Sequence, residues 1–110
     1  MTLRVTALIP DLLFGSNVEG ALTTAGHDVK LVGRADAIDP EATDVLVVDL
    51  MADGLDLAAL AQLGPKTLGF FPHVEPAVRA EAVAAGFDLV VPRSKMHRQG
   101  IGLVEKLAAG

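Results

Sequence analysis

The sequence contains no cysteine, tryptophan or tyrosine, and only four of its 110 residues are phenylalanine. Without cysteine the chain can form neither disulfides nor thiolate metal sites, which is typical of proteins from a reducing compartment. It also lacks an apolar run of the ~18–20 residues that a membrane-spanning helix needs. Basic residues are scarce: the chain has 9 Lys and Arg residues but 14 Asp and Glu residues, which gives a net charge of −5. This balance argues against nucleic-acid binding, which requires a clustered basic surface.

The residues that are present are largely aliphatic, with 51% of the chain hydrophobic and 21% charged. This composition is typical of a globular protein, and the length predicts a single domain over residues 1–110. The start of the chain, "MTLRVTALIPD", has one arginine and no small-residue cleavage pattern, so we do not expect a signal peptide. We therefore expect a soluble, cytoplasmic domain that does not act at a membrane.

Apolar runs alternate with helical patterns along the whole chain. Short apolar runs predict strands at 3–9, 28–33, 44–50, 66–71 and 87–91. Helical patterns lie between them, at 55–64, from Pro76 to Ala85, and from about Lys95, where Ile101, Val104 and Leu107 share one face. This alternation predicts an α/β fold, with a doubly wound parallel sheet and right-handed crossovers.

The first helix is predicted from apolar residues at helical spacing, Val18, Ala21, Leu22 and Ala25. Ser16 and Glu19 match a capping box, which favours a helix start near Ser16 rather than Asp11. Gly26 follows at the position of a left-handed C-cap. The connection at 34–43 is about as short as a parallel crossover can be, so we expect its helix to be a turn or two.

Five strands in this sequence favour the flavodoxin-like order 2-1-3-4-5, with a shortened second helix. In such sheets ligands bind at the carboxyl ends of the strands, near the point where the strand order reverses. The residues that the predicted strands bring to that rim are Asp11, Asp49, Phe71, Pro72, His73, Arg93 and Ser94.

Two segments of this layout resemble the receiver domain of two-component response regulators. "DVLVVDLMADGLD" (44–56) is similar to the receiver strand that ends in the phosphoacceptor, and "AVAAGFDLVVPRS" (82–94) is similar to the receiver's fourth helix and fifth strand. The spacing from Asp11 to Gly26 also fits the receiver's first helix. The resemblance covers essentially the whole chain and implies a signalling or protein-interaction module, with Asp49 as the possible phosphoacceptor.

The sequence departs from the receiver pattern where a receiver binds Mg²⁺. Receivers end their first strand with adjacent acidic residues, but Ile9 and Pro10 occupy those positions here. Only Asp11 remains, one residue later. Asp11 and Asp49 could supply two of the oxygen ligands that Mg²⁺ prefers. We therefore expect no cofactor, with Mg²⁺ at Asp11 and Asp49 as a weak candidate.

Other functional positions of the resemblance are also altered. Phe71 replaces the hydroxyl residue at the end of the fourth strand, Arg93 replaces the lysine, and Ser94 replaces the proline beside it. Val90 stands at the aromatic switch position. These changes imply a receiver fold with a degraded phosphorylation site.

We predict that Arg93 lies close enough to Asp49 to interact, with Asp11 beside them, because the strands end on the same rim. Each residue also has a purely structural alternative. Asp49 could hydrogen-bond the loop at Asp53 and Gly54, and Asp11 could cap the first helix. Arg93 could form a structural ion pair in place of the metal's charge.

The other rim residues carry weaker hypotheses. His73 is either a general base or a solvated loop residue. Ser94 has no histidine and aspartate at recognisable spacing, and no cluster has the spacing of a zinc or iron site. Phe71 and Pro72 either pack inside or form an apolar docking surface. We assign no catalytic residue, and whether the protein is an enzyme stays open.

A second resemblance supports an alternative function. "GSNVEGALTTAGHDVKLVGR" (15–34) is similar to the stretch after the glycine loop of Rossmann dehydrogenases, which would place Arg34 near an NADP 2′-phosphate. However, Gly15 is the only glycine at the phosphate-binding position, and Asp11 would face the pyrophosphate. The alternative is therefore a small ligand-binding or enzymatic domain of degenerate dinucleotide-binding type. The main hypothesis expects another protein as the partner, and the sequence leaves the oligomeric state open.

Overall fold

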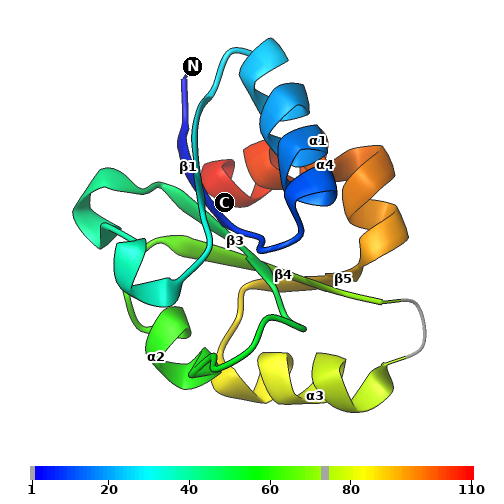
Figure 1. Ribbon diagram of the computed structural model, residues 1–110. Coiled ribbons are helices and arrows are strands. Elements are labelled where there is room, and N and C mark those ends of the chain that lie inside the picture. Colours follow the sequence, from blue (N-terminus) through cyan, green and yellow to red (C-terminus); the bar gives the residue numbers. More distant parts are fainter. Residues whose placement is uncertain (1, 73–74) are drawn as a thin grey trace.

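The computed structural model describes residues 2–72 and 75–110 (Figure 1). Its five strands form one parallel sheet in the order β2-β1-β3-β4-β5, as predicted from the sequence. The strands are β1 (Arg4–Leu8), β2 (Asp28–Val32), β3 (Val45–Asp49), β4 (Lys66–Phe71) and β5 (Leu89–Pro92).

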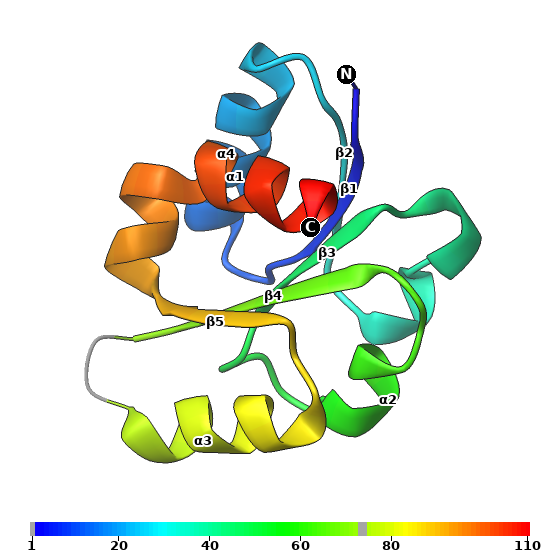
Figure 2. The same ribbon diagram turned by 180° about the vertical axis from the view of Figure 1, so that it is seen from behind.

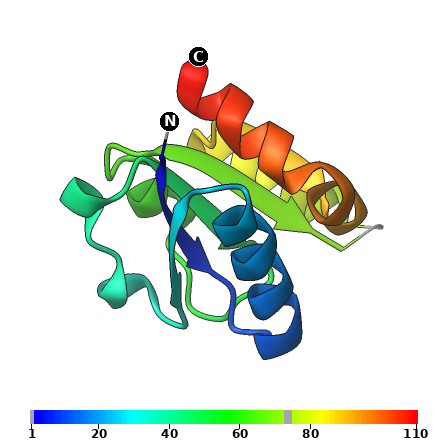
Figure 3. The same ribbon diagram turned by 90° about the horizontal axis from the view of Figure 1, so that it is seen from above.

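In the described residues four α-helices cover the two faces of this sheet: α1 (Leu12–Thr24), α2 (Leu57–Ala61), α3 (Pro76–Ala85) and α4 (Arg93–Ala109). Figures 1 and 2 show α1 and α4 on one face, with α2 and α3 on the other. From above, α1 and α4 lie side by side over the sheet (Figure 3). None of the helices in the described part of the chain is both long and apolar enough to cross a membrane.

The connection between β2 and β3 contains only two short 3₁₀ turns, Ala35–Ala37 and Pro40–Ala42. Asp39 caps the second turn by accepting a hydrogen bond from the Glu41 backbone N–H, and Pro40 occupies its first position. The prediction that this crossover has no room for a full helix is therefore confirmed.

The central strand β3 contributes to two cores, because successive side chains of a strand point to opposite faces. Val45 and Val47 pack beneath α1 and α4, whereas Leu46 and Val48 pack against the α2 and α3 side. All four are fully buried. This explains the continuous apolar run in the sequence, which is typical of a parallel strand covered on both faces.

The first helix begins earlier than the capping-box pattern predicted. It starts at Leu12, directly after its N-cap Asp11, and Ser16 lies exposed inside it. Because of this earlier start, the buried stripe is Phe14, Val18 and Leu22, spaced by one helical turn. The predicted face was therefore only partly right, since Ala21 and Ala25 are exposed and Val18 and Leu22 are buried. Gly26 has φ of +96°, as the predicted left-handed C-cap requires.

The last helix also begins earlier than expected, at Arg93 rather than Lys95. Its buried residues are Met96 and Val104, with Leu107 packed partly buried against the same core. Ile101 is 36% exposed, so its predicted place on the buried face was wrong. The earlier start matters for the site, because it makes Arg93 a helical residue rather than part of the loop between the last strand and the last helix.

Candidate functional site

The carboxyl ends of the strands bring the predicted residues to one rim of the sheet. Asp49 is the last residue of β3 and Phe71 the last residue of β4. Arg93 opens α4 directly after β5, and Asp11 precedes α1 shortly after β1. Parallel pairing of β1, β3, β4 and β5 places all four of these positions at the same edge.

Asp11 is the N-cap of α1, which confirms the structural alternative for this residue. Its Oδ1 accepts hydrogen bonds from the backbone N–H groups of Leu13 at 3.0 Å and Phe14 at 3.1 Å. Its Oδ2 accepts one from Arg93 Nη2 at 3.1 Å. The backbone N–H of Phe14, and then the Arg93 guanidinium, lower the pKa of Asp11 below its ordinary value of 3.8.

Arg93 therefore pairs with Asp11, and the prediction that it pairs with Asp49 was wrong. The structure gives a physical reason, because Arg93 in the first turn of α4 reaches Asp11, which caps the start of α1. The guanidinium carbon also stands 4.1 Å from the centroid of the Phe14 ring. Such a contact is worth about 0.5–1 kcal/mol at an exposed site. The Arg93 guanidinium is thus held by the carboxylate of the α1 N-cap and by the ring of Phe14 in the first turn of α1.

Asp49 is partly buried, and its carboxylate is used by the turn that follows it. Oδ1 accepts a hydrogen bond from the backbone N–H of Met51 at 3.0 Å. The backbone carbonyl of Asp49 accepts another from the N–H of Ala52 at 3.0 Å. Aspartate commonly stabilises a turn in this way. The predicted contact with the following loop exists, although it is made at Met51 rather than at Asp53 and Gly54.

A cleft of about 600 Å³ lies beside Asp49, between the loops that follow β2 and β3. It is located where the strand order reverses, the usual ligand position in this class of sheet. Three carboxylates line it, from Asp36, Asp49 and Asp53, together with the guanidinium of Arg34. Arg34 Nη2 donates to Asp36 Oδ2 at 2.6 Å, so its charge is already balanced.

Sequence reasoning had not placed Asp36 at the site, and it gave Asp53 only as a hydrogen-bonding partner of Asp49. Both residues could have been found from the positions of their loops in the predicted strand order. Asp36 lies in the loop after β2 and Asp53 in the loop after β3. These strands lie on either side of β1, where the strand order reverses. Within the described residues, no group of three or more His, Cys, Asp or Glu side chains is arranged to hold a metal ion.

The remaining candidates have different environments. Phe71 is only 5% exposed and packs in the core next to α2 and α3, so it does not contribute to an apolar docking surface. Ser94 is exposed in the first turn of α4, where its backbone carbonyl accepts from Arg98 Nε at 3.4 Å. Val90 is buried in β5. His73 lies outside the described residues.

No sequence model of a known family matches the chain, and no curated protein matches it. The fold, however, is similar to solved structures. A response regulator from Thermotoga maritima aligns with a TM-score of 0.80 at 15% identity, covering 100% of both chains. The receiver domain of the putative response regulator NarL from Mycobacterium tuberculosis aligns with a TM-score of 0.81 at 24% identity, covering 99% of this chain and 98% of that one.

A third structure, NtrX from Brucella abortus in complex with ADP, aligns with a TM-score of 0.85 at 18% identity. That alignment covers 99% of this chain but 27% of the NtrX chain. At these identities the similarity concerns the arrangement of the backbone and not the residues of the site. The chain therefore has the flavodoxin-like fold of response regulator receiver domains.

Proposed function

We propose that this chain is a cytoplasmic, receiver-like signalling or protein-interaction module with a degraded phosphorylation site. The fold similarity to receiver domains over the full length of the chain supports the first part of the proposal. Asp49 ends β3, the position that the sequence resemblance assigns to the phosphoacceptor. Its partly buried carboxylate borders a cleft of about 600 Å³.

The degraded site is inferred from one observation, the engagement of Asp11. In the receiver pattern, acidic residues at the end of the first strand join the phosphoacceptor in holding Mg²⁺. Here the buried Ile9 and the following Pro10 offer no side-chain oxygen. The carboxylate of Asp11 already accepts hydrogen bonds from two backbone N–H groups and from Arg93. A metal ion at Asp11 would have to displace the helix cap or the ion pair.

The residues at the positions that would stabilise a phosphoryl group are also unsuited to that role. Phosphoryl transfer depends on positioning and on charge stabilisation by metal ions and cations. Phe71 at the end of β4 is apolar and buried, so it cannot donate a hydrogen bond to a phosphoryl oxygen. Arg93 is bound to Asp11 and to the Phe14 ring. We therefore expect Asp49 to contribute to partner binding or stability rather than to accept phosphate.

Incubation with acetyl phosphate and Mg²⁺, followed by intact mass measurement, tests the degraded site. We expect no stoichiometric mass gain in the wild-type protein or in Asp49→Asn. A Mg²⁺-dependent gain of one phosphoryl group that disappears in Asp49→Asn would restore an ordinary receiver.

A separate experiment tests the interaction module. A photo-crosslinking amino acid at Met51, which is exposed next to Asp49, should capture a defined partner protein in the source cells. Asp49→Asn should change the yield of that crosslink. The absence of any specific crosslink from several rim positions would contradict a protein-interaction role.

In the alternative function, the binding of a small ligand, the cleft beside Asp49 would be the binding site. Its charges do not suit a dinucleotide, because Arg34 is paired with Asp36 and the other charged groups of the lining are carboxylates. In addition, Asp11 occupies the N-terminus of α1, where a pyrophosphate would bind. A thermal-shift panel of nucleotides and phosphorylated metabolites should show no concentration-dependent rise in Tm. A rise that Arg34→Gln abolishes would favour the ligand-binding function.

A further inference from the structure

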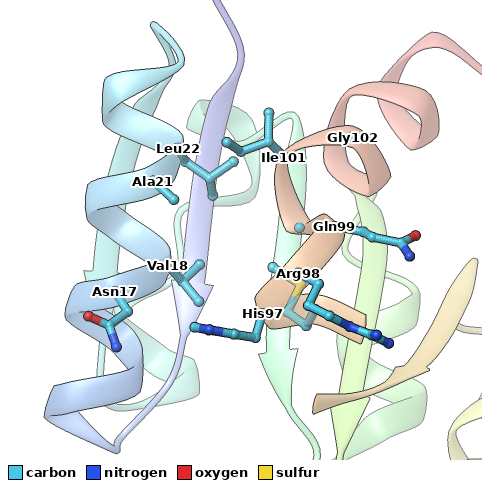
Figure 4. Close-up of a pocket in the computed structure, with 11 residues that line it drawn as sticks. Asn17, Val18, Ala21, Leu22, His97, Arg98, Gln99, Ile101 and Gly102 are labelled. Carbon is cyan, nitrogen blue, oxygen red and sulfur yellow. The ribbon is translucent and has the colours of Figure 1, made fainter. Parts of the chain in front are cut away.

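A second hollow lies away from the rim, in the groove between α1 and α4 (Figure 4). Its volume is about 190 Å³. The apolar residues lining it include Val18, Ala21 and Leu22 on α1, and Met96 and Ile101 on α4. Figure 4 shows Leu22 and Ile101 extending toward one another, and His97 pointing across the groove toward α1.

Small residues keep this groove open. Gly100 and Gly102 lie in the middle of α4, although glycine disfavours the interior of a helix. At Gly100, a Cβ atom would lie 3.0 Å from Met96 Cε, so the end of the Met96 side chain would have to shift to make room for it. At Gly102, a Cβ would meet nothing within 4 Å. A side chain at Gly102 would therefore enter the groove without straining the fold.

The outer face of α1 is unusually poor in charge for a helix at the surface. Among its 13 residues only Glu19 is charged. Leu12 and Leu13 in its first turn are 77% and 75% exposed. Surface helices usually carry charged residues on the face opposite the core. An uncharged outer face beside an apolar groove is typical of a surface that another protein covers.

The other side of the groove is basic, in a chain whose net charge is −5. No acidic residue occurs between Asp88 and Glu105, while Lys95 and Arg98 lie in the first turns of α4. Neither forms an ion pair with another described residue. Figure 4 shows Arg98 extending from the side of α4 away from α1, so this cation borders the groove rather than fills it. Lys95 lies one helical turn before Gln99 of the lining. This distribution favours an acidic occupant over a second copy, because two copies meeting here would oppose like charges.

We propose that the groove between α1 and α4 binds an acidic amphipathic helix of a partner protein. One apolar side chain of that helix enters the groove, since a cavity of about 150 Å³ holds a benzene molecule and this one measures about 190 Å³. Its carboxylates lie beside Lys95 and Arg98. Burial of the apolar anchor supplies affinity, and the charges select the partner. The inference rests on the proposed function of the chain as a protein-interaction module and adds the partner's chemistry.

Two synthetic peptides test this inference. Both are helix-forming and share one leucine and phenylalanine face, but the polar face is glutamate in one and lysine in the other. Fluorescence anisotropy should show at least tenfold tighter binding of the acidic peptide, with a preference that decreases as salt rises. Amide chemical shifts should change at Val18, Ala21 and Ile101.

Matched variants locate the binding surface. Gly102→Leu fills the groove and should lower the affinity for the acidic peptide at least tenfold. Gly20→Leu is its control, because Gly20 is also an exposed helical glycine with open space around it, yet it does not line the groove. Arg98→Glu should lower the affinity for the acidic peptide. Arg79→Glu, on α3 at the other face of the sheet, should leave that affinity unchanged. Circular dichroism confirms that each variant is folded.

The outcomes separate this inference from the proposed function. Equal binding of the two peptides, no binding of either, or equal effects of Gly102→Leu and Gly20→Leu would overturn the groove proposal. A dimer of the wild-type protein in sedimentation experiments, if Gly102→Leu dissociates it, would also overturn the groove proposal, because the occupant of the groove would then be a second copy of the chain. In each of these cases a partner crosslinked through Met51 would leave the proposed function intact. If the crosslink through Met51 is not seen but the peptides bind as expected, protein binding at the rim is contradicted and peptide binding in the groove is not.

Discussion

Replacing Phe71 with threonine restores a hydroxyl where the receiver pattern has one and tests whether the aromatic ring is structural. Phe71 is 5% exposed and packs in the core beneath α2 and α3. Truncation of a buried phenylalanine to alanine costs about 3–5 kcal/mol. Threonine retains little more volume and buries a hydroxyl, which costs about 1–3 kcal/mol when it has no partner. We therefore expect a loss of at least ~3 kcal/mol.

This loss is a large fraction of the roughly 5–15 kcal/mol that stabilises a typical domain. With a urea m-value of about 2 kcal/mol/M, the unfolding midpoint should fall by about 1.5 M or more. Leu13→Ala is the control, because Leu13 is 75% exposed and its truncation should change stability by less than about 0.5 kcal/mol. Urea titration followed by circular dichroism measures both variants. A Phe71→Thr protein as stable as the control, or one that acquires stoichiometric labelling by acetyl phosphate, would refute the structural role.

Three further predictions follow from particular contacts. Gly69→Ala should lower stability by about 1–3 kcal/mol in urea titrations, because its Cβ would lie 3.0 Å from three core side-chain atoms; Gly20→Ala, in open space, should not be destabilising. Arg93→Gln should raise the pKa of Asp11 toward 3.8 without fully restoring it, since the backbone N–H bonds remain; a carboxyl NMR titration with an unchanged pKa would contradict the ion pair. The pKa values of Asp11 and Asp44 are both lowered below 3.8 in the fold. Their stabilisation is therefore present above that pH and lost as pH falls below it. The urea midpoint of the wild-type protein should therefore be lower at pH 3 than at pH 6, and the difference should be smaller in Asp44→Asn.

The sequence was sufficient to predict the fold because its patterns follow simple geometric rules. The apolar run of β3, buried on both faces, indicated a central parallel strand. The short segment between β2 and β3 excluded a full helix. Helix starts were less predictable, since the capping-box match at Ser16 competed with the true cap at Asp11. Local hydrogen-bonding patterns recur by chance, and packing of Phe14 against the sheet favours the earlier start.

The candidate site was predicted less well, because its geometry depends on side-chain directions that strand order does not determine. Sequence reasoning placed Asp11, Asp49 and Arg93 on one rim but paired Arg93 with the wrong carboxylate. The pairing was decided by the start of α4, a shift of two residues that turns Arg93 toward α1. The groove between α1 and α4 has no single motif, and it became visible only when the two helices were placed side by side.

The most direct test of the account is a titration of ¹⁵N-labelled protein with Mg²⁺ and beryllofluoride, which mimics an acyl phosphate on aspartate. The account predicts no saturable change in the amide shifts of Asp49, Met51 and Arg93, because Asp11 is held by α1 and Arg93 and cannot join Asp49 at a metal ion. Asp49→Asn should give the same spectra with and without the reagent. Saturable, Mg²⁺-dependent shifts around Asp49 that are absent in Asp49→Asn would contradict the account and show a working phosphorylation site.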